Sequence, residues 1–275
     1  MLPFDVQYFR PDSLREALST YEELQADGLS PMYWAGGTEI LTLGRTLEHE
    51  TGAVVDIKSI PELQVHEVAD GTIHLGAART LAEVCDEDLF PLLTSVCGRI
   101  ADHTGRCKIT LGGDIAGSIP YREAALPFLL TASRARVADA GGVRETAFGD
   151  LFDGTLHLPA GAILVELNLP AADAQAPRFH HKATRLDWID YPLVTIAGLR
   201  QGGRIRLAFS GLTATPLRPA AAEDALNGHG APEARAQRAL EAIEDPITED
   251  IHGSAAWRRF VTAGLLTDMI ADLEG

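Results

Sequence analysis

The sequence contains two pairs of adjacent glycines in similar surroundings, and these pairs place the strongest constraint on the fold. The first lies in Ala35-Gly36-Gly37-Thr38-Glu39 and the second in Thr110-Leu111-Gly112-Gly113-Asp114. Each pair stands where a short apolar run ends and a polar segment begins. Adjacent glycines allow positive φ and keep side chains away, so consecutive N–H groups can point at one anion. One such turn can hold a phosphate, and two turns brought together by the fold suit the pyrophosphate of a dinucleotide.

Composition places the chain among ordinary globular proteins. It has 275 residues, of which 46% are hydrophobic and 23% charged. No stretch approaches the roughly 18 apolar residues that a membrane span requires, and the first residues lack the features of a signal peptide, so we expect a cytoplasmic protein.

Acidic residues outnumber basic ones by 39 to 23, for a formal charge of −16. Such a surface repels nucleic acid, which we exclude as a partner.

No arrangement of residues indicates a catalytic or metal site. Cys85, Cys97 and Cys107 have neither the spacing of a disulfide framework nor that of a metal or iron–sulfur motif. We expect Cys107 to be a small buried thiol. The His180-His181 pair has no Cys or acidic partner at ligand spacing. Any iron–sulfur chemistry connected with this protein must therefore sit on another chain.

The first part of the chain reads as a compact parallel α/β unit. Strands are predicted over residues 5–9, 31–35 and 53–56, with helices from Ser13 to Leu24 and from Thr38 to Leu47. Ser13 and Glu16 form a capping box for the first helix. The first glycine turn then lies at the carboxyl end of a strand, where parallel sheets bind ligands.

The remainder reads as helices mixed with hairpin strands. The predicted segments are strands 66–68 and 72–75, a helix from Thr80, helical stretches 90–104 and 124–131, strands 135–138 and 162–167, a linker 171–177, a hairpin 193–200/204–210, and helices 220–226, 232–243 and 254–273. In the last helix an apolar stripe from Trp257 to Met269 belongs to the core or to an interface. The fold class is therefore α+β, with predicted domains 1–57, 58–172 and 173–275.

The order and spacing of these segments resemble the FAD-binding medium subunit of molybdenum hydroxylases, the xanthine dehydrogenase and carbon monoxide dehydrogenase family. The motifs that carry the resemblance, besides the two glycine turns, are Phe9 to Ala17, Asp56 to Leu63, Ile73 to Ala77, Phe148 to Gly154, Glu166 to Pro170, Lys182 to Arg185, Asp190 to Pro192, Thr215 to Arg218 and Trp257 to Arg259. The resemblance covers nearly the whole chain. It implies two α/β subdomains that enclose FAD, followed by a C-terminal domain with a small antiparallel sheet and helices.

The resemblance also implies the cofactor site. Its expected residues are Ala35, Gly36, Gly37, Thr38 and Glu39 on one part of the pyrophosphate, Thr110, Gly112, Gly113, Asp114 and Ile115 on the other, and Glu123, Lys182 and Tyr191. Two positions depart from the family pattern, because relatives usually carry Asp where Glu39 stands and Asn where Asp114 stands. An ionised Asp114 would weaken binding of a phosphate unless Lys108, Arg106 or a backbone donor offsets its charge. Glu123, nine residues further on, stands where relatives often carry Asp.

The function implied by the family is electron transfer. Electrons from a molybdopterin-containing large subunit would pass through [2Fe–2S] clusters on a small subunit to FAD on this chain, and then to NAD or another acceptor. Two alternatives stay open. One is a self-sufficient flavin oxidoreductase of the same wider fold, and the other is an assembly subunit that has lost FAD, which Asp114 makes conceivable.

Overall fold

The N-terminal unit is a small parallel sheet with two helices. The computed structural model describes residues 2–186 and 188–275. The elements of this unit are β1 (Gln7–Phe9), α1 (Leu14–Ala26), β2 (Met32–Trp34), α2 (Thr38–Arg45) and β3 (Ala53–Asp56). Strand β3 lies between β1 and β2, and both pairings are parallel. The Ser13 hydroxyl accepts the Glu16 N–H and caps α1. The predicted parallel α/β arrangement is confirmed.

The middle unit is a five-stranded antiparallel sheet with short helices, and its strand order is β4-β5-β8-β6-β7. Its elements are the 3₁₀ turn η1 (Pro61–Leu63), β4 (His66–Ala69), β5 (Thr72–Gly76), α3 (Leu81–Glu87), α4 (Pro91–Cys97), α5 (His103–Arg106), α6 (Leu111–Ala116), η2 (Glu123–Ala125), α7 (Leu126–Leu129), β6 (Arg134–Asp139), β7 (Gly142–Ala147), η3 (Phe148–Asp150) and β8 (Ile163–Pro170). Strand β8 is buried along almost its whole length, because it pairs with a strand on each side.

The helical stretch predicted over 90–104 is two separate helices. Helix α4 ends at Cys97, and Ala101 adopts a positive φ of 49° that no helix accommodates. The Asp102 carboxylate then accepts the Gly105 N–H at 2.6 Å and starts α5. Cys107 follows α5 on the surface and is exposed, so the expectation that it would be buried is wrong.

The C-terminal unit is a three-stranded antiparallel sheet in the order β11-β10-β9, backed by helices. Its elements are β9 (Arg178–Thr184), β10 (Pro192–Gln201), β11 (Arg204–Ser210), α9 (Ala220–Leu226), α10 (Pro232–Glu241) and α11 (Ala255–Glu274), and α8 (Ala171–Ala174) precedes them within the predicted linker. On α11, Leu265 and Met269 are buried in this unit's core, whereas Trp257 and Phe260 are exposed. Only part of the predicted stripe therefore belongs to the core.

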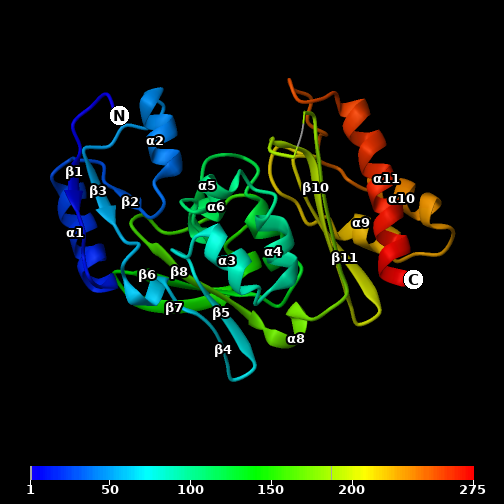
Figure 1. Ribbon diagram of the computed structural model, residues 1–275, viewed down its shortest axis with the longest axis horizontal. Coiled ribbons are helices and arrows are strands. Elements are labelled where there is room, and N and C mark those ends of the chain that lie inside the picture. Colours follow the sequence, from blue (N-terminus) through cyan, green and yellow to red (C-terminus); the bar gives the residue numbers. More distant parts are fainter. Residues whose placement is uncertain (1, 187) are drawn as a thin grey trace.

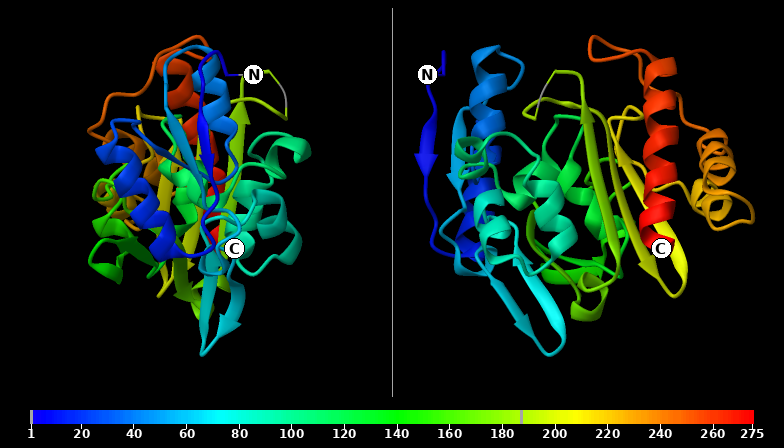
Figure 2. Two further views of the ribbon diagram at one scale, coloured as in Figure 1. Left: turned by 90° about the vertical axis from the view of Figure 1, so that its left-hand side faces the viewer. Right: turned by 45° about the vertical axis from the view of Figure 1, so that its right-hand side comes forward.

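The three units follow one another across the molecule (Figure 1), with the middle helices between the N-terminal sheet and the C-terminal sheet. Helices α9 and α11 contact the C-terminal sheet, and Figure 2 shows α11 lying along its outer side. Helices α4 and α7 contact β9 and β11 from the middle unit. The three sheets fall inside the three predicted domain ranges, whose boundaries stay a prediction. No helix in the described part of the chain is long and apolar enough to cross a membrane.

Candidate functional site

A cavity of about 620 Å³ lies where the three units meet. Its walls come from the first glycine turn after β2, the second glycine turn at the start of α6, the segment 117–123, and residues of β9 and the loop that follows it. The predicted site residues on these walls are Ala35, Gly36, Gly37, Thr38, Glu39, Thr110, Gly112, Gly113, Asp114, Glu123, Lys182 and Tyr191. Ile115 is fully buried in the core and is not among the residues that line the cavity.

The first glycine turn is shaped by its neighbours. Gly37 has a φ of 68°, and a Cβ added there would stand 2.1 Å from the Trp34 ring. A Cβ on Gly36 would stand 1.8 Å from the carbonyl oxygen of Lys108. Only glycine fits either position. The contact with Lys108 also places the first turn beside the segment that leads into the second turn.

The backbone N–H groups of the first turn are available to a ligand. Gly37 is the N-cap of α2 and has no side chain to cap the helix. Within the described residues, the N–H groups of Gly36, Gly37, Thr38 and Glu39 make no hydrogen bond. Unpaired N–H groups at the start of a helix carry partial positive charge and bind anions. This turn can therefore hold a phosphate.

The second glycine turn is built differently, because its N–H groups are used within the protein. Gly112 N–H donates to the Ala77 carbonyl at 2.7 Å, and Leu111 N–H donates to the Arg79 carbonyl at 2.8 Å. Gly113 N–H donates to the Thr110 hydroxyl at 3.2 Å. A Cβ on Gly112 would stand 2.8 Å from the Cβ of Ala77. The two turns are thus not equivalent cradles: the second brings the backbone close to the cavity without offering these N–H groups to it.

Glu39 connects the two glycine segments. Its carboxylate accepts the N–H and the hydroxyl of Ser118, at 2.7 and 2.6 Å, and the N–H of Ile119 at 3.2 Å. Ser118 and Ile119 follow α6. The side chain of Glu39 therefore holds the loop after the second turn against the start of α2.

A cluster of charged side chains also lines the cavity. Lys182 Nζ is 2.8 Å from the Glu123 carboxylate and 3.0 Å from the Arg99 carbonyl, and both Lys182 and Glu123 are about 5% exposed. The Thr195 hydroxyl donates to the other Glu123 oxygen. The Asp114 carboxylate accepts the N–H of Ala124 at 3.0 Å. Asp114, Glu123 and Lys182 were predicted as site residues, but the sequence did not predict the contact between Glu123 and Lys182.

Burial raises the pKa of Asp114 to about 7, and the neighbouring Glu123 carboxylate acts in the same direction. The Ala124 N–H, Lys182 and Arg122 oppose this rise. Of the three compensating groups expected, the backbone donor is present as the Ala124 N–H, whereas Lys108 and Arg106 are not among the groups that act on Asp114. The Arg106 guanidinium instead donates to the carbonyls of Ile100 and Ala101.

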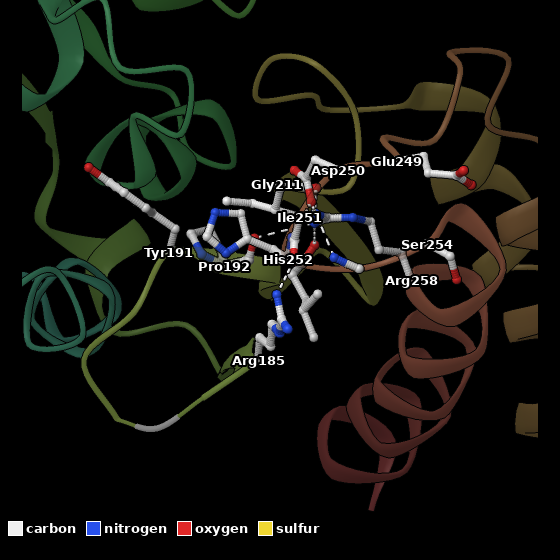
Figure 3. A network of polar contacts seen from close by, with 12 residues as sticks. Arg185, Tyr191, Pro192, Gly211, Glu249, Asp250, Ile251, His252, Ser254 and Arg258 are labelled. Atoms are coloured by element: carbon white, nitrogen blue, oxygen red, sulfur yellow. Dashed lines mark hydrogen bonds and ion pairs between the residues drawn. The ribbon is translucent and has the colours of Figure 1, made fainter.

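Tyr191 lies at the edge of the cavity in an aromatic cluster. Its ring stacks on Tyr121 with centroids 4.8 Å apart, and His252 packs edge-on against it at 6.0 Å. Arg258, fully buried on α11, holds the neighbouring backbone by donating to the carbonyls of Pro192, Leu193 and Gly211 and pairing with Asp250. In Figure 3 the Tyr191 side chain points away from this network. Arg258 thereby fixes the start of β10, directly after Tyr191.

Sequence reasoning missed many residues of the cavity wall, and two of them, Tyr121 and Arg122, make specific contacts there. Tyr121 stacks on Tyr191, and Arg122 donates to the carbonyls of Gly117 and Gly154. The backbone of Arg122 has a φ of 37°, a positive value that residues other than glycine rarely adopt. The only signal in the sequence was their place between two predicted site residues, Asp114 and Glu123. In the described part of the chain, no group of three or more His, Cys, Asp or Glu side chains is placed to hold a metal ion.

Comparison with known families agrees with this geometry. A family model described as "FAD binding domain in molybdopterin dehydrogenase" matches residues 4–172. The chain belongs to this family. A second family model, "CO dehydrogenase flavoprotein C-terminal domain", matches residues 190–273. The resemblance seen in the sequence is confirmed, and the protein is an FAD-binding medium subunit of the molybdenum hydroxylase family.

Individual relatives match over nearly the full length. The carbon monoxide dehydrogenase medium chain of Hydrogenophaga pseudoflava is 27% identical over 275 residues, which cover 94% of this chain and 93% of the relative. The solved structure of carbon monoxide dehydrogenase from the same organism aligns with a TM-score of 0.88 at 26% identity, covering 100% of this chain and 99% of that chain. Quinoline 2-oxidoreductase from Pseudomonas putida 86 aligns with a TM-score of 0.85, also at 26% identity and with the same coverage.

The residues present fit FAD. The cavity has the size typical of cofactor sites and combines apolar walls with a few polar groups. The unpaired N–H groups of the first turn suit a pyrophosphate oxygen. Residues of all three units line this one cavity, among them the first turn, the charged cluster and Tyr191, so one ligand can contact all three units.

Proposed function

We propose that this chain is the electron-transfer subunit of a molybdenum-dependent oxidoreductase, in which FAD accepts electrons from iron–sulfur clusters on a partner chain and passes them to NAD or another acceptor. Bound FAD supplies chemistry that the side chains lack, since it can take up electrons singly and release them in pairs. The chain's own residues bind and orient the cofactor and restrict its access to water.

The observation that carries the proposal is the first glycine turn facing the large cavity. Its N–H groups at Gly36 to Glu39 would hold the pyrophosphate, where the start of α2 favours negative charge. The second turn, packed on Ala77, would let the cofactor approach the backbone closely. Tyr191 and Tyr121 would border the cofactor from the C-terminal side.

The proposed partners are a molybdopterin-containing large subunit and a small subunit with [2Fe–2S] clusters. The proposal is supported by the family to which the chain belongs and by the spacing of its three cysteines, which matches no cluster motif. The chain with FAD alone should show no oxidation of heteroaromatic or aldehyde substrates. Purification from its natural source should yield a complex that contains molybdenum, iron and about one FAD per chain.

We also propose NAD as the electron acceptor, on the basis of the family to which the chain belongs. The test is rapid mixing of the FAD-loaded chain with NADH, followed at the flavin absorption bands. Bleaching of these bands at a rate that saturates with NADH concentration supports NAD as the physiological acceptor. If NADH leaves the bands unchanged while an artificial donor bleaches them, the acceptor is another molecule.

One observation favours the self-sufficient flavin oxidoreductase as a second candidate. A carboxyl group with a pKa of about 7 on the cavity wall, as at Asp114, is suited to general acid–base catalysis. This candidate requires substrate oxidation by the lone FAD-loaded chain. Asp114→Asn would then abolish turnover while the chain still binds FAD.

A further inference from the structure

Asp114 presents one carboxyl oxygen to the protein and leaves the other without a partner. Its Oδ2 accepts the N–H of Ala124 at 3.0 Å. No hydrogen bond to Oδ1 is found in the part of the chain that the structure describes, although the residue lines the cavity. A proton on Oδ1 would therefore be free to point at a bound ligand.

A second carboxylate, that of Glu123, and two cations, Lys182 and Arg122, surround Asp114, and within the described residues neither cation bonds to it. The Glu123 carboxylate on η2 takes the Lys182 ammonium of β9, at 2.8 Å, and the Thr195 hydroxyl of β10. The Arg122 guanidinium is directed at the carbonyls of Gly117 and Gly154. From α4 the only titratable neighbour is the fully buried Cys97 thiol, whose pKa is raised well above its ordinary value by burial. Asp114 is thus left without a bonded cation.

Asp114 is only partly exposed, and its carboxyl group favours the neutral form because partial burial and a second carboxylate both disfavour the charge. The pKa of Asp114, raised to about 7 by burial and by Glu123, agrees with this arrangement. A neutral carboxylic acid has one donor and one acceptor, as does the face of an amide side chain. It can therefore face a bound ligand without repelling a phosphate.

We propose that Asp114 binds the cofactor as a neutral carboxylic acid, donating a hydrogen bond from Oδ1 to an acceptor atom of the ligand in the cavity. This inference rests on the proposed binding of FAD there. Raising the pH removes the proton and leaves an unpaired carboxylate facing the ligand. If only the protonated form binds, the Kd for FAD rises about tenfold between about pH 6 and about pH 8, as the protonated fraction falls.

The first test measures the Kd for FAD against pH by equilibrium titration, using the full chain with any subunits that co-purify and with bound flavin removed. Wild type should show the tenfold rise. Asp114→Asn should bind with a Kd independent of pH, and about tenfold more tightly than wild type at about pH 8. Two controls should keep the wild-type dependence: Asp86→Asn, the same change on the exposed surface, and His252→Gln, which removes the imidazole beside Tyr191.

The second test uses wild type alone and so does not depend on the folding of a variant. Calorimetry in buffers of different ionisation enthalpy gives the number of protons taken up when FAD binds. The expected uptake is about one proton at about pH 8 and close to zero at about pH 6.

A pH-independent Kd in wild type, an Asp114→Asn variant that keeps the dependence, or no proton uptake would each overturn the inference. In all of these outcomes FAD still binds, so the proposed function stands. Failure of every variant and of wild type to bind FAD at any pH would instead refute the proposed function.

Discussion

At the scale of single residues, the first glycine turn owes its composition to packing as well as to ligand binding. The Cβ of a Gly37→Ala variant would point at the Trp34 ring and not into the cavity, and Gly37 also has a positive φ. Gly71, in the β4–β5 hairpin, has a similar φ of 74° with nothing within 4 Å of an added Cβ. Gly71→Ala should reduce the free energy of unfolding by about 1 kcal/mol through backbone strain alone. Gly37→Ala should reduce it by a further 1–3 kcal/mol, approximately, through the clash with Trp34. Urea unfolding of the two variants measures the difference, and equal losses would show that Trp34 moves aside freely.

Asp114 should also make the stability of the flavin-free protein depend on pH. Its pKa is about 7 in the folded chain against roughly 3.9 in an unfolded one, so the folded state binds the extra proton between these values. The contribution of Asp114 to stability is therefore complete below about pH 4 and is lost as the pH rises to about 7. Asp114→Asn should be more stable than wild type at about pH 8, and this advantage should shrink toward about pH 4. Urea unfolding at several pH values gives the curves, and parallel curves for the two proteins would contradict the assignment.

At the scale of elements, α11 is tied to the sheet by one buried side chain. Arg258 is fully buried and donates to three carbonyls from the start of β10 and from Gly211, while it pairs with Asp250 at 2.6 Å. Arg258→Met leaves these acceptors unpaired and should reduce the free energy of unfolding by roughly 3–5 kcal/mol. Arg259→Met is the matched control on the exposed face of the same helix and should change it by less than about 0.5 kcal/mol. Near-UV circular dichroism of Arg258→Met should also change, because the Tyr191–Tyr121 stack adjoins this backbone. Similar stabilities for the two variants would show that α11 is held by its apolar face alone.

Elements with clear apolar patterns could be predicted from the sequence, and polar ones could not. The three parallel strands and the β10–β11 hairpin were found because their residues alternate or are continuously apolar. Strand β9 was missed because its sequence, Arg-Phe-His-His-Lys-Ala-Thr, is mostly polar, and β7 was missed because it is an exposed edge strand. The break between α4 and α5 depends on the positive φ of Ala101, which has no signature in the sequence.

At the scale of the whole molecule, the site is built from segments that only the fold brings together. The glycine pairs could be recognised because glycine is required locally, and the family resemblance added Glu123, Lys182 and Tyr191. The contact between Glu123 and Lys182 joins η2 to β9, and no local pattern predicts such a pair. The different use of the N–H groups in the two turns was equally hidden, because it depends on the carbonyls of Ala77 and Arg79, more than 30 residues earlier in the chain.

The central claim is that this chain passes electrons between other redox centres through FAD. The most direct measurement is rapid mixing of the assembled complex with its reducing substrate, with absorption of the iron–sulfur clusters and of the flavin followed separately. The account predicts that reduction of the clusters precedes reduction of FAD, and that the FAD-loaded chain alone is not reduced by the substrate. Direct reduction of FAD in the lone chain by the substrate, as fast as in the complex, would contradict it.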